Sequence, residues 1–402
     1  MTPDADGQRL TPVRSKSWRS LSAGSLMLLT AIALCPVYVF DSGGVQPGHA
    51  LFFLAFLSHI FSKQAVPRAG WTAGVALIVF VYGRELASQL HYPEFSFPKA
   101  PLFIAFNVLI CVFSRDAFAR SGVNAFAPGF LAAGLVAGIS IALSQVGVLE
   151  SRNPYRPTGL FNNPNQLGYF GCCLLAFSLI PHGPDERREH QRIAIAAIAL
   201  YIILISLSKA AILAAGAALA LGVPQLIERR SHRWLGLTLI LAGSVLSAEQ
   251  VARAPMVADA VTRLASIGEQ EDDSLEGRGY GALAEFGAIE ALIGVGTAGV
   301  ADAMGPAWDD GLEIHSTLGA HFGAYGLIGL LLLFSFFWSL LRHSISTVSK
   351  RSVLAIAIAP LIYGLAHNGI RFTFAWILLA AWSASSSPGR RLPKGSGQLH
   401  AE

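Results

Sequence analysis

The sequence carries little charge. Only 13% of its 402 residues are Asp, Glu, Lys or Arg, about half of the roughly 25% found in soluble domains. Hydrophobic residues make up 53% of the chain. A soluble core cannot bury that much apolar surface, so the composition excludes an ordinary water-soluble protein and predicts an all-α integral membrane protein.

Cysteine is scarce, and the sequence lacks several other signals. The four cysteines (Cys35, Cys111, Cys172, Cys173) lie in or beside apolar segments, so we expect no disulfide framework and no cysteine chemistry. No low-complexity tract or long repeat divides the chain, which favours a single polytopic membrane domain over residues 1–402. There is no nucleotide-phosphate loop, and the acidic residues near 269–273 are not spaced as ligands of a divalent cation. We therefore expect neither a metal nor a cofactor.

Long apolar runs recur from one end of the chain to the other. The first follows a basic stretch but has no Ala-x-Ala cleavage site behind it, so we expect an uncleaved helix. A hydrocarbon layer of about 30 Å then predicts twelve transmembrane helices. Their approximate bounds are 21–40, 48–62, 70–83, 100–114, 122–148, 167–181, 193–207, 210–227, 234–249, 316–341, 352–366 and 372–385.

Basic residues are divided unequally between the two sides of this topology. Alternate connections, beginning with the N-terminal tail, hold 20 of the Lys and Arg residues, whereas the other connections hold nine. The positive-inside rule then places both termini in the cytoplasm. The net charge of +4 needs no nucleic-acid partner, because these residues face the anionic headgroups of membrane lipids.

Several residues on the opposite, outer side are candidates for function. The connection 151–165 is rich in Pro, Gly and Asn, and it is either an ordinary turn-rich loop or a polar binding loop that offers Arg156 and Asn165. Lys209 lies in a short polar break between two apolar runs. It is either a lysine whose amine reaches the membrane interface or a binding residue.

The largest outer segment is a periplasmic loop over about 250–315, between the ninth and tenth helices. It holds twelve acidic residues and three arginines, and residues 278–292 could form a short helix on the membrane surface. Arg278 either pairs with a nearby carboxylate or binds an anion, for which the fork of guanidinium donors is well suited.

Two outer histidines complete the set. His315 precedes Ser316 at the start of the tenth helix, and it is either a structural interfacial histidine or a titratable base among cations. The tight turn 367–371 contains His367 and Arg371, which either support the same site or cap two helix ends.

Four motifs in residues 150–375 resemble those of the O-antigen ligase and polymerase family. They are the run from Arg156 to Asn165, the pair Ser208-Lys209, Glu276-Gly-Arg278 with the later Gly294-Val-Gly296, and His315-Ser316 followed after nine residues by Gly326-Leu-Ile-Gly329. The last is the most specific and looks like the signature of the ligase branch. One departure is that the family usually has Ser-Arg where this chain has Ser208-Lys209.

The resemblance implies a GT-C-like glycosyltransferase of the bacterial inner membrane. Such enzymes transfer a glycan from an undecaprenyl diphosphate carrier to an acceptor hydroxyl, on lipid A core or a similar acceptor, at the periplasmic face. It implies that Lys209, Arg278 and Arg156 bind the diphosphate and that His315 orients or deprotonates the acceptor. Asn165, Ser316, His367 and Arg371 would support the site. We expect a metal-independent, inverting transfer in which His315 and Arg278 are catalytic.

Other functions stay open from the sequence. A polymerase of O-antigen or exopolysaccharide, or a protein O-oligosaccharyltransferase, would use the same donor and differ only in the acceptor. A multispan transporter or flippase is a different class. Transporters usually place charges at mid-membrane depth and have repeated halves, neither of which is evident here. A non-catalytic membrane scaffold is a third class.

Overall fold

The computed structural model describes residues 21–40, 44–62, 69–95, 99–153, 156–180, 186–228, 262, 279–305, 314–347 and 350–385. All regular structure within these ranges is helical, so the predicted all-α class is confirmed. Within the described ranges, five helices are long and apolar enough to cross a membrane, and the protein is membrane-embedded. They span Trp71–His91, Ala100–Ser121, Val123–Gln145, Glu189–Ser206 and Thr317–Ser346.

A helix coincides with each predicted span that falls within the described residues. The ninth predicted span, 234–249, lies outside them. The helices are α1 (Ala23–Ala33), α2 (Pro47–Phe61), α3 (Trp71–His91), α4 (Ala100–Ser121), α5 (Ala127–Gln145), α6 (Pro164–Leu179), α7 (Glu186–Ser206), α8 (Lys209–Glu228), α16 (Thr317–Thr347), α17 (Lys350–Ala366) and α18 (Thr373–Ser385), with the short 3₁₀ helix η2 (Val123–Phe126) before α5.

Several predicted boundaries differ from the structure, among them the ends of α3, α4 and α16 and the start of α7, and two of the differences have a clear physical reason. Helix α1 ends at Ala33 instead of residue 40, because Pro36 disfavours helical backbone at Cys35 before it. Helix α3 continues past residue 83 to His91. Its additional turns include Arg84 and Glu85, whose charged groups have polar partners inside the protein instead of marking the end of the helix.

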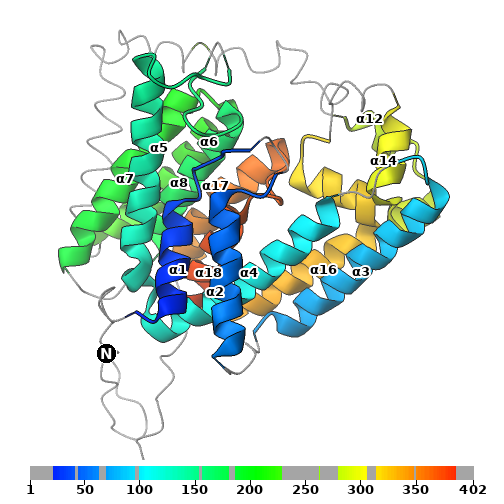
Figure 1. Ribbon diagram of the computed structural model, residues 1–402, viewed down its shortest axis with the longest axis horizontal. Coiled ribbons are helices and arrows are strands. Elements are labelled where there is room, and N and C mark those ends of the chain that lie inside the picture. Colours follow the sequence, from blue (N-terminus) through cyan, green and yellow to red (C-terminus); the bar gives the residue numbers. More distant parts are fainter. Residues whose placement is uncertain are drawn as a thin grey trace, which may run out of the picture.

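The helices pack into one bundle in which α17 and α18 occupy the middle (Figure 1). Helix α17 packs on α8 and α6, whereas α18 packs on α4 and α6. Helices α3, α4 and α16 lie side by side in the other half of the bundle. Helix α6 is almost entirely buried, and Gly168 and Gly171 let it approach α7 and α8 closely, as small residues do between membrane helices.

The segment predicted to be a long periplasmic loop forms three short helices within its described residues 279–305. They are α12 (Gly281–Ala284), α13 (Ala288–Ile293) and α14 (Gly296–Met304). The single surface helix predicted over 278–292 is therefore wrong, because the chain breaks at 285–287 between α12 and α13. Helix α14 was not predicted, and it packs against α3 and α16 at one end of the bundle (Figure 1).

The segment 279–305 packs against a kink in α16. Gly326 has φ 62° and ψ −166°, a conformation open in practice only to glycine. A Cβ there would lie 2.5 Å from both the Gly294 nitrogen and the Leu292 carbonyl oxygen. Gly294 itself has φ 77°, and the Val295 amide donates to the Gly323 carbonyl (3.1 Å). The motif Gly294-Val-Gly296 therefore packs directly against the motif Gly326-Leu-Ile-Gly329.

We predict that Gly326→Ala destabilises the protein by about 2 kcal/mol or more, because alanine strains the backbone and overlaps with the loop. Gly138→Ala is the matched control. Gly138 lies inside α5 with open space around its Cα, so alanine should stabilise by about 0.4–1 kcal/mol. Unfolding of both variants in detergent measures the difference. Equal stabilities would contradict the packing described here.

Candidate functional site

Arg156 connects the first motif, the run from Arg156 to Asn165, with the turn that carries the second motif, Ser208-Lys209. Its Nη1 lies 3.4 Å from the Asn165 Oδ1 and 3.4 Å from the Leu207 carbonyl oxygen, so it donates to both segments. Leu207 has φ 50° and directly precedes Ser208 and Lys209, where α8 begins. Lys209 is half-buried at this end of the bundle. The guanidinium therefore joins the loop before α6 to the turn between α7 and α8.

A second set of contacts continues from Asn165 to the two histidines. The Tyr363 hydroxyl donates to the Asn165 carbonyl (2.8 Å). The ring centroid of Tyr363 lies 4.8 Å from that of His367, which lies 6.5 Å from that of His315. Arg156, Asn165, His367 and His315 thus lie along one continuous series of contacts, which we call the outer chain. Tyr363, which connects its two halves, was missed by sequence reasoning because it lies within an apolar span.

The start of α16 fixes His315 against the turn 367–371. Ser316 Oγ accepts a hydrogen bond from the Gly319 amide (3.1 Å), so this predicted supporting residue acts here as a helix cap. Thr317 Oγ1 donates to the His367 carbonyl (3.1 Å) and accepts from the Gly369 amide (2.8 Å). Thr317 therefore holds the turn beside His315.

Arg278 lies outside the described residues, so the structure does not place this predicted catalytic residue. The chain resumes at Gly279 and Tyr280. The Tyr280 hydroxyl lies 3.5 Å from the Leu365 carbonyl oxygen, near the end of α17 where His367 follows.

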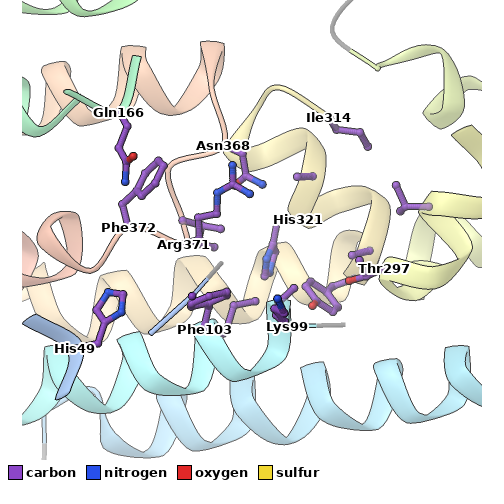
Figure 2. A pocket seen from close by; sticks show the side chains of 18 of the residues that line it. His49, Lys99, Phe103, Gln166, Thr297, Ile314, His321, Asn368, Arg371 and Phe372 are labelled. Carbon is purple, nitrogen blue, oxygen red and sulfur yellow. The ribbon is translucent and has the colours of Figure 1, made fainter. Parts of the chain in front are cut away.

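A cavity of about 320 Å³ adjoins the outer chain (Figure 2). Among the predicted site residues that the structure describes, only Arg371 lines it; His315 does not, although Ile314 does. The Arg371 guanidinium carbon lies 5.6 Å from the centroid of the Phe372 ring. Several polar lining residues were not predicted, namely His49, Lys99, Gln166, Thr297, His321 and Asn368.

Two of these missed residues carried a signal in the sequence. His321 is an ionisable side chain within an apolar span, which by itself suggests a functional site. Asn368 belongs to the predicted turn between His367 and Arg371. No sequence pattern could place Lys99 or Gln166 at the cavity, because their positions depend on how α4 and α6 pack.

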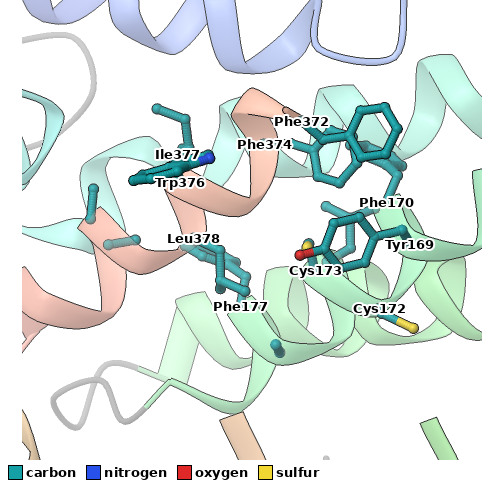
Figure 3. Close-up of a cluster of buried hydrophobic side chains, with 14 of the residues drawn as sticks. Tyr169, Phe170, Cys172, Cys173, Phe177, Phe372, Phe374, Trp376, Ile377 and Leu378 are labelled. Atoms are coloured by element: carbon teal, nitrogen blue, oxygen red, sulfur yellow. The ribbon is translucent and has the colours of Figure 1, made fainter. Parts of the chain in front are cut away.

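An aromatic cluster supports the outer chain from within the bundle (Figure 3). The Tyr169 ring stacks on Tyr363 with centroids 4.1 Å apart, and it also contacts Phe374 of α18 at 5.4 Å. Phe170 meets Phe374 edge to face at 5.4 Å. These contacts fix α6 and α17 relative to each other, so Asn165 and His367 are held by packing of the core.

A buried carboxylate supports the other wall of the cavity. Glu85 is completely buried, and it accepts hydrogen bonds from the Thr297 amide (3.1 Å), the Thr297 hydroxyl (2.6 Å) and the Tyr325 hydroxyl (2.7 Å). Arg84 beside it donates to the Gly294 carbonyl (2.8 Å). Thr297 and Tyr325 both line the cavity, so Glu85 joins α3 to α14 and α16 directly behind it.

The charged side chains that line the cavity are both cationic. Lys99 is exposed at its rim and Arg371 is half-buried, whereas no Asp or Glu is among the lining residues that the structure describes. Glu85 lies behind Thr297 and Tyr325. Within the described ranges, no group of three His, Cys, Asp or Glu residues lies close enough to hold a metal ion.

The chain matches no protein-family profile, and comparison with curated proteins gives no match. The likeness to the O-antigen ligase and polymerase family therefore rests on the four motifs themselves.

We predict that Glu85→Leu destabilises the protein by at least about 2 kcal/mol, because the Thr297 and Tyr325 donors would remain buried without an acceptor. Glu85→Gln keeps one acceptor oxygen and should cost less. Glu285→Leu, at an exposed position, should stay within about 0.5 kcal/mol of the parent protein. Unfolding in detergent measures all three. A Glu85→Leu protein as stable as Glu285→Leu would exclude this role.

Proposed function

We propose that this protein is an O-antigen ligase-like glycosyltransferase with twelve spans and a GT-C-like architecture. It transfers a glycan from an undecaprenyl diphosphate carrier to an acceptor hydroxyl, on lipid A core or a similar acceptor, at the periplasmic face of a bacterial inner membrane. The observation that supports this most is the outer chain. It brings the Arg156–Asn165 loop, the Ser208-Lys209 turn and His315 to one end of the bundle, beside a cavity lined by cations.

Positive side chains near the diphosphate would stabilise it as the leaving group. When the glycosidic bond to the diphosphate breaks, negative charge grows on the phosphate oxygens. Fixed positive groups stabilise that transition state more than the ground state. Arg156 already offers its guanidinium at the junction of two motifs, and Lys209 begins the helix beside it. Arg278 is the third cation in this proposal. Arginine donates two parallel hydrogen bonds to phosphate, whereas Lys209 acts as a point charge.

His315 is the proposed proton acceptor. A guanidinium cannot accept a proton at neutral pH, whereas a neutral imidazole can. The acceptor oxygen attacks the anomeric carbon, the bond from that carbon to the diphosphate oxygen breaks, and the acceptor proton passes to His315. A single displacement of this kind inverts the anomeric configuration. The half-buried position of His315 beside His367 leaves it open to a bound acceptor.

We predict that His315→Ala lowers glycan transfer from a purified lipid diphosphate donor by about a hundredfold or more, because proton transfer contributes roughly 10²–10⁴-fold. His343→Ala is the matched control, since His343 is exposed near the opposite end of the same helix. It should retain full activity.

Full transfer by His315→Ala would overturn this mechanism. The products identify the acceptor in the same experiment. Capped lipid core indicates a ligase, longer polysaccharide a polymerase, and glycosylated protein a protein O-oligosaccharyltransferase.

A further inference from the structure

His321 is a second imidazole, and it faces the cavity instead of the outer chain (Figure 2). Its side chain is 2% exposed. Its Nε2 lies 3.2 Å from the Gly329 carbonyl oxygen. Because a carbonyl can only accept, Nε2 carries the proton in this contact, and Nδ1 of the neutral ring is an acceptor. Within the described residues Nδ1 has no hydrogen-bond donor.

The kink in α16 allows the contact between His321 and the Gly329 carbonyl. In a straight helix, a side chain does not reach a carbonyl eight residues further along. The non-helical backbone at Gly326 brings the Gly329 carbonyl to the imidazole. Tyr325, whose ring centroid lies 4.8 Å from that of His321, is fixed in turn by its hydrogen bond to Glu85. The glycine motif therefore leaves Nδ1 as the acceptor of the ring, and Glu85 fixes the tyrosine that packs beside it.

The other polar groups of the cavity indicate what His321 would bind. Asn368 Oδ1 is a second buried acceptor without a hydrogen-bond donor among the described residues. Two unused acceptors require a ligand with hydroxyl donors, whereas Lys99 and Arg371 favour an anionic group. The aromatic rings of Phe103 and Phe372 add apolar walls, and the volume is near the lower end of the roughly 300–1,000 Å³ of small-molecule pockets.

We propose that this cavity binds the acidic end of a glycan. A sugar hydroxyl donates to His321 Nδ1, and a carboxylate or phosphate on the sugar is held by Arg371 and Lys99. The identification of the ligand as a glycan rests on the proposed function. The role of His321 in binding is separate from the proton transfer assigned to His315, and it requires no lipid-linked donor.

The test measures binding of three probes to the purified full-length protein without donor. Galactose, galacturonic acid and galactose 6-phosphate share one ring and differ in charge, and ligand-detected NMR titration gives their apparent Kd values. We expect one or both acids to bind about tenfold more tightly than galactose. If only one of them does, it identifies the anionic group. Arg371→Gln should remove most of this preference.

Two nearly isosteric substitutions test His321 itself. His321→Gln keeps both a donor for Gly329 and an acceptor for the ligand, so its Kd should stay within about threefold of the parent value. His321→Met loses both and should bind all three probes about tenfold more weakly. His343→Met, at the exposed end of α16, is the control for the substitution and should bind normally.

Equal binding of His321→Met and His321→Gln, or of galactose and both acids, would overturn the proposal. If His321→Met does not fold, an unchanged Kd in Arg371→Gln still overturns it. These results are independent of glycan transfer. Loss of transfer in His315→Ala together with failure of all three probes would reject this inference and leave the proposed function standing.

Discussion

The hydrogen bonds of the buried Glu85 side chain are the interaction on which the cavity end of this bundle most depends. An ionisable group inside a membrane protein requires several good hydrogen bonds, and Glu85 obtains them from Thr297 and Tyr325, which belong to two different segments. These bonds hold α14 on α3 and fix α16 at Tyr325, directly before its kink at Gly326. Thr297 of α14 and Tyr325 of α16 line one wall of the cavity, so the hydrogen bonds of Glu85 fix that wall.

The site has two adjoining parts. The outer chain carries Arg156 and His315, and the cavity carries Arg371 and His321. The two parts touch at the turn 367–371 and at the start of α16, where His367 and His315 belong to the chain while Asn368 and Ile314 line the cavity. A transferase needs separate places for a donor and an acceptor that meet at one reacting centre. In the proposed function, the diphosphate lies at the outer chain and the acidic glycan in the cavity.

Long apolar runs predicted the helical class and the approximate position of each described long helix, because the hydrocarbon layer of a membrane requires such runs. They could not predict the true end of α3. Arg84 and Glu85 resemble the polar end of a span until their partners Gly294 and Thr297, far along the chain, are known. The motifs identified Arg156 and His315 as candidates, and the tight turn 367–371 identified Arg371. His321 and Lys99 were missed, because their place at the cavity depends on the kink and on helix packing.

The proposed function requires the polar site to lie at the end of the bundle opposite the basic connections. Labelling of single cysteines with a membrane-impermeant maleimide measures this orientation, in a protein whose four native cysteines are replaced by alanine. Glu285 and Arg351 are both exposed, in the long loop and at the start of α17 respectively. We expect Glu285→Cys to react in intact spheroplasts and Arg351→Cys to react only after lysis. Reaction of both from the same side, or the reverse order, would contradict it.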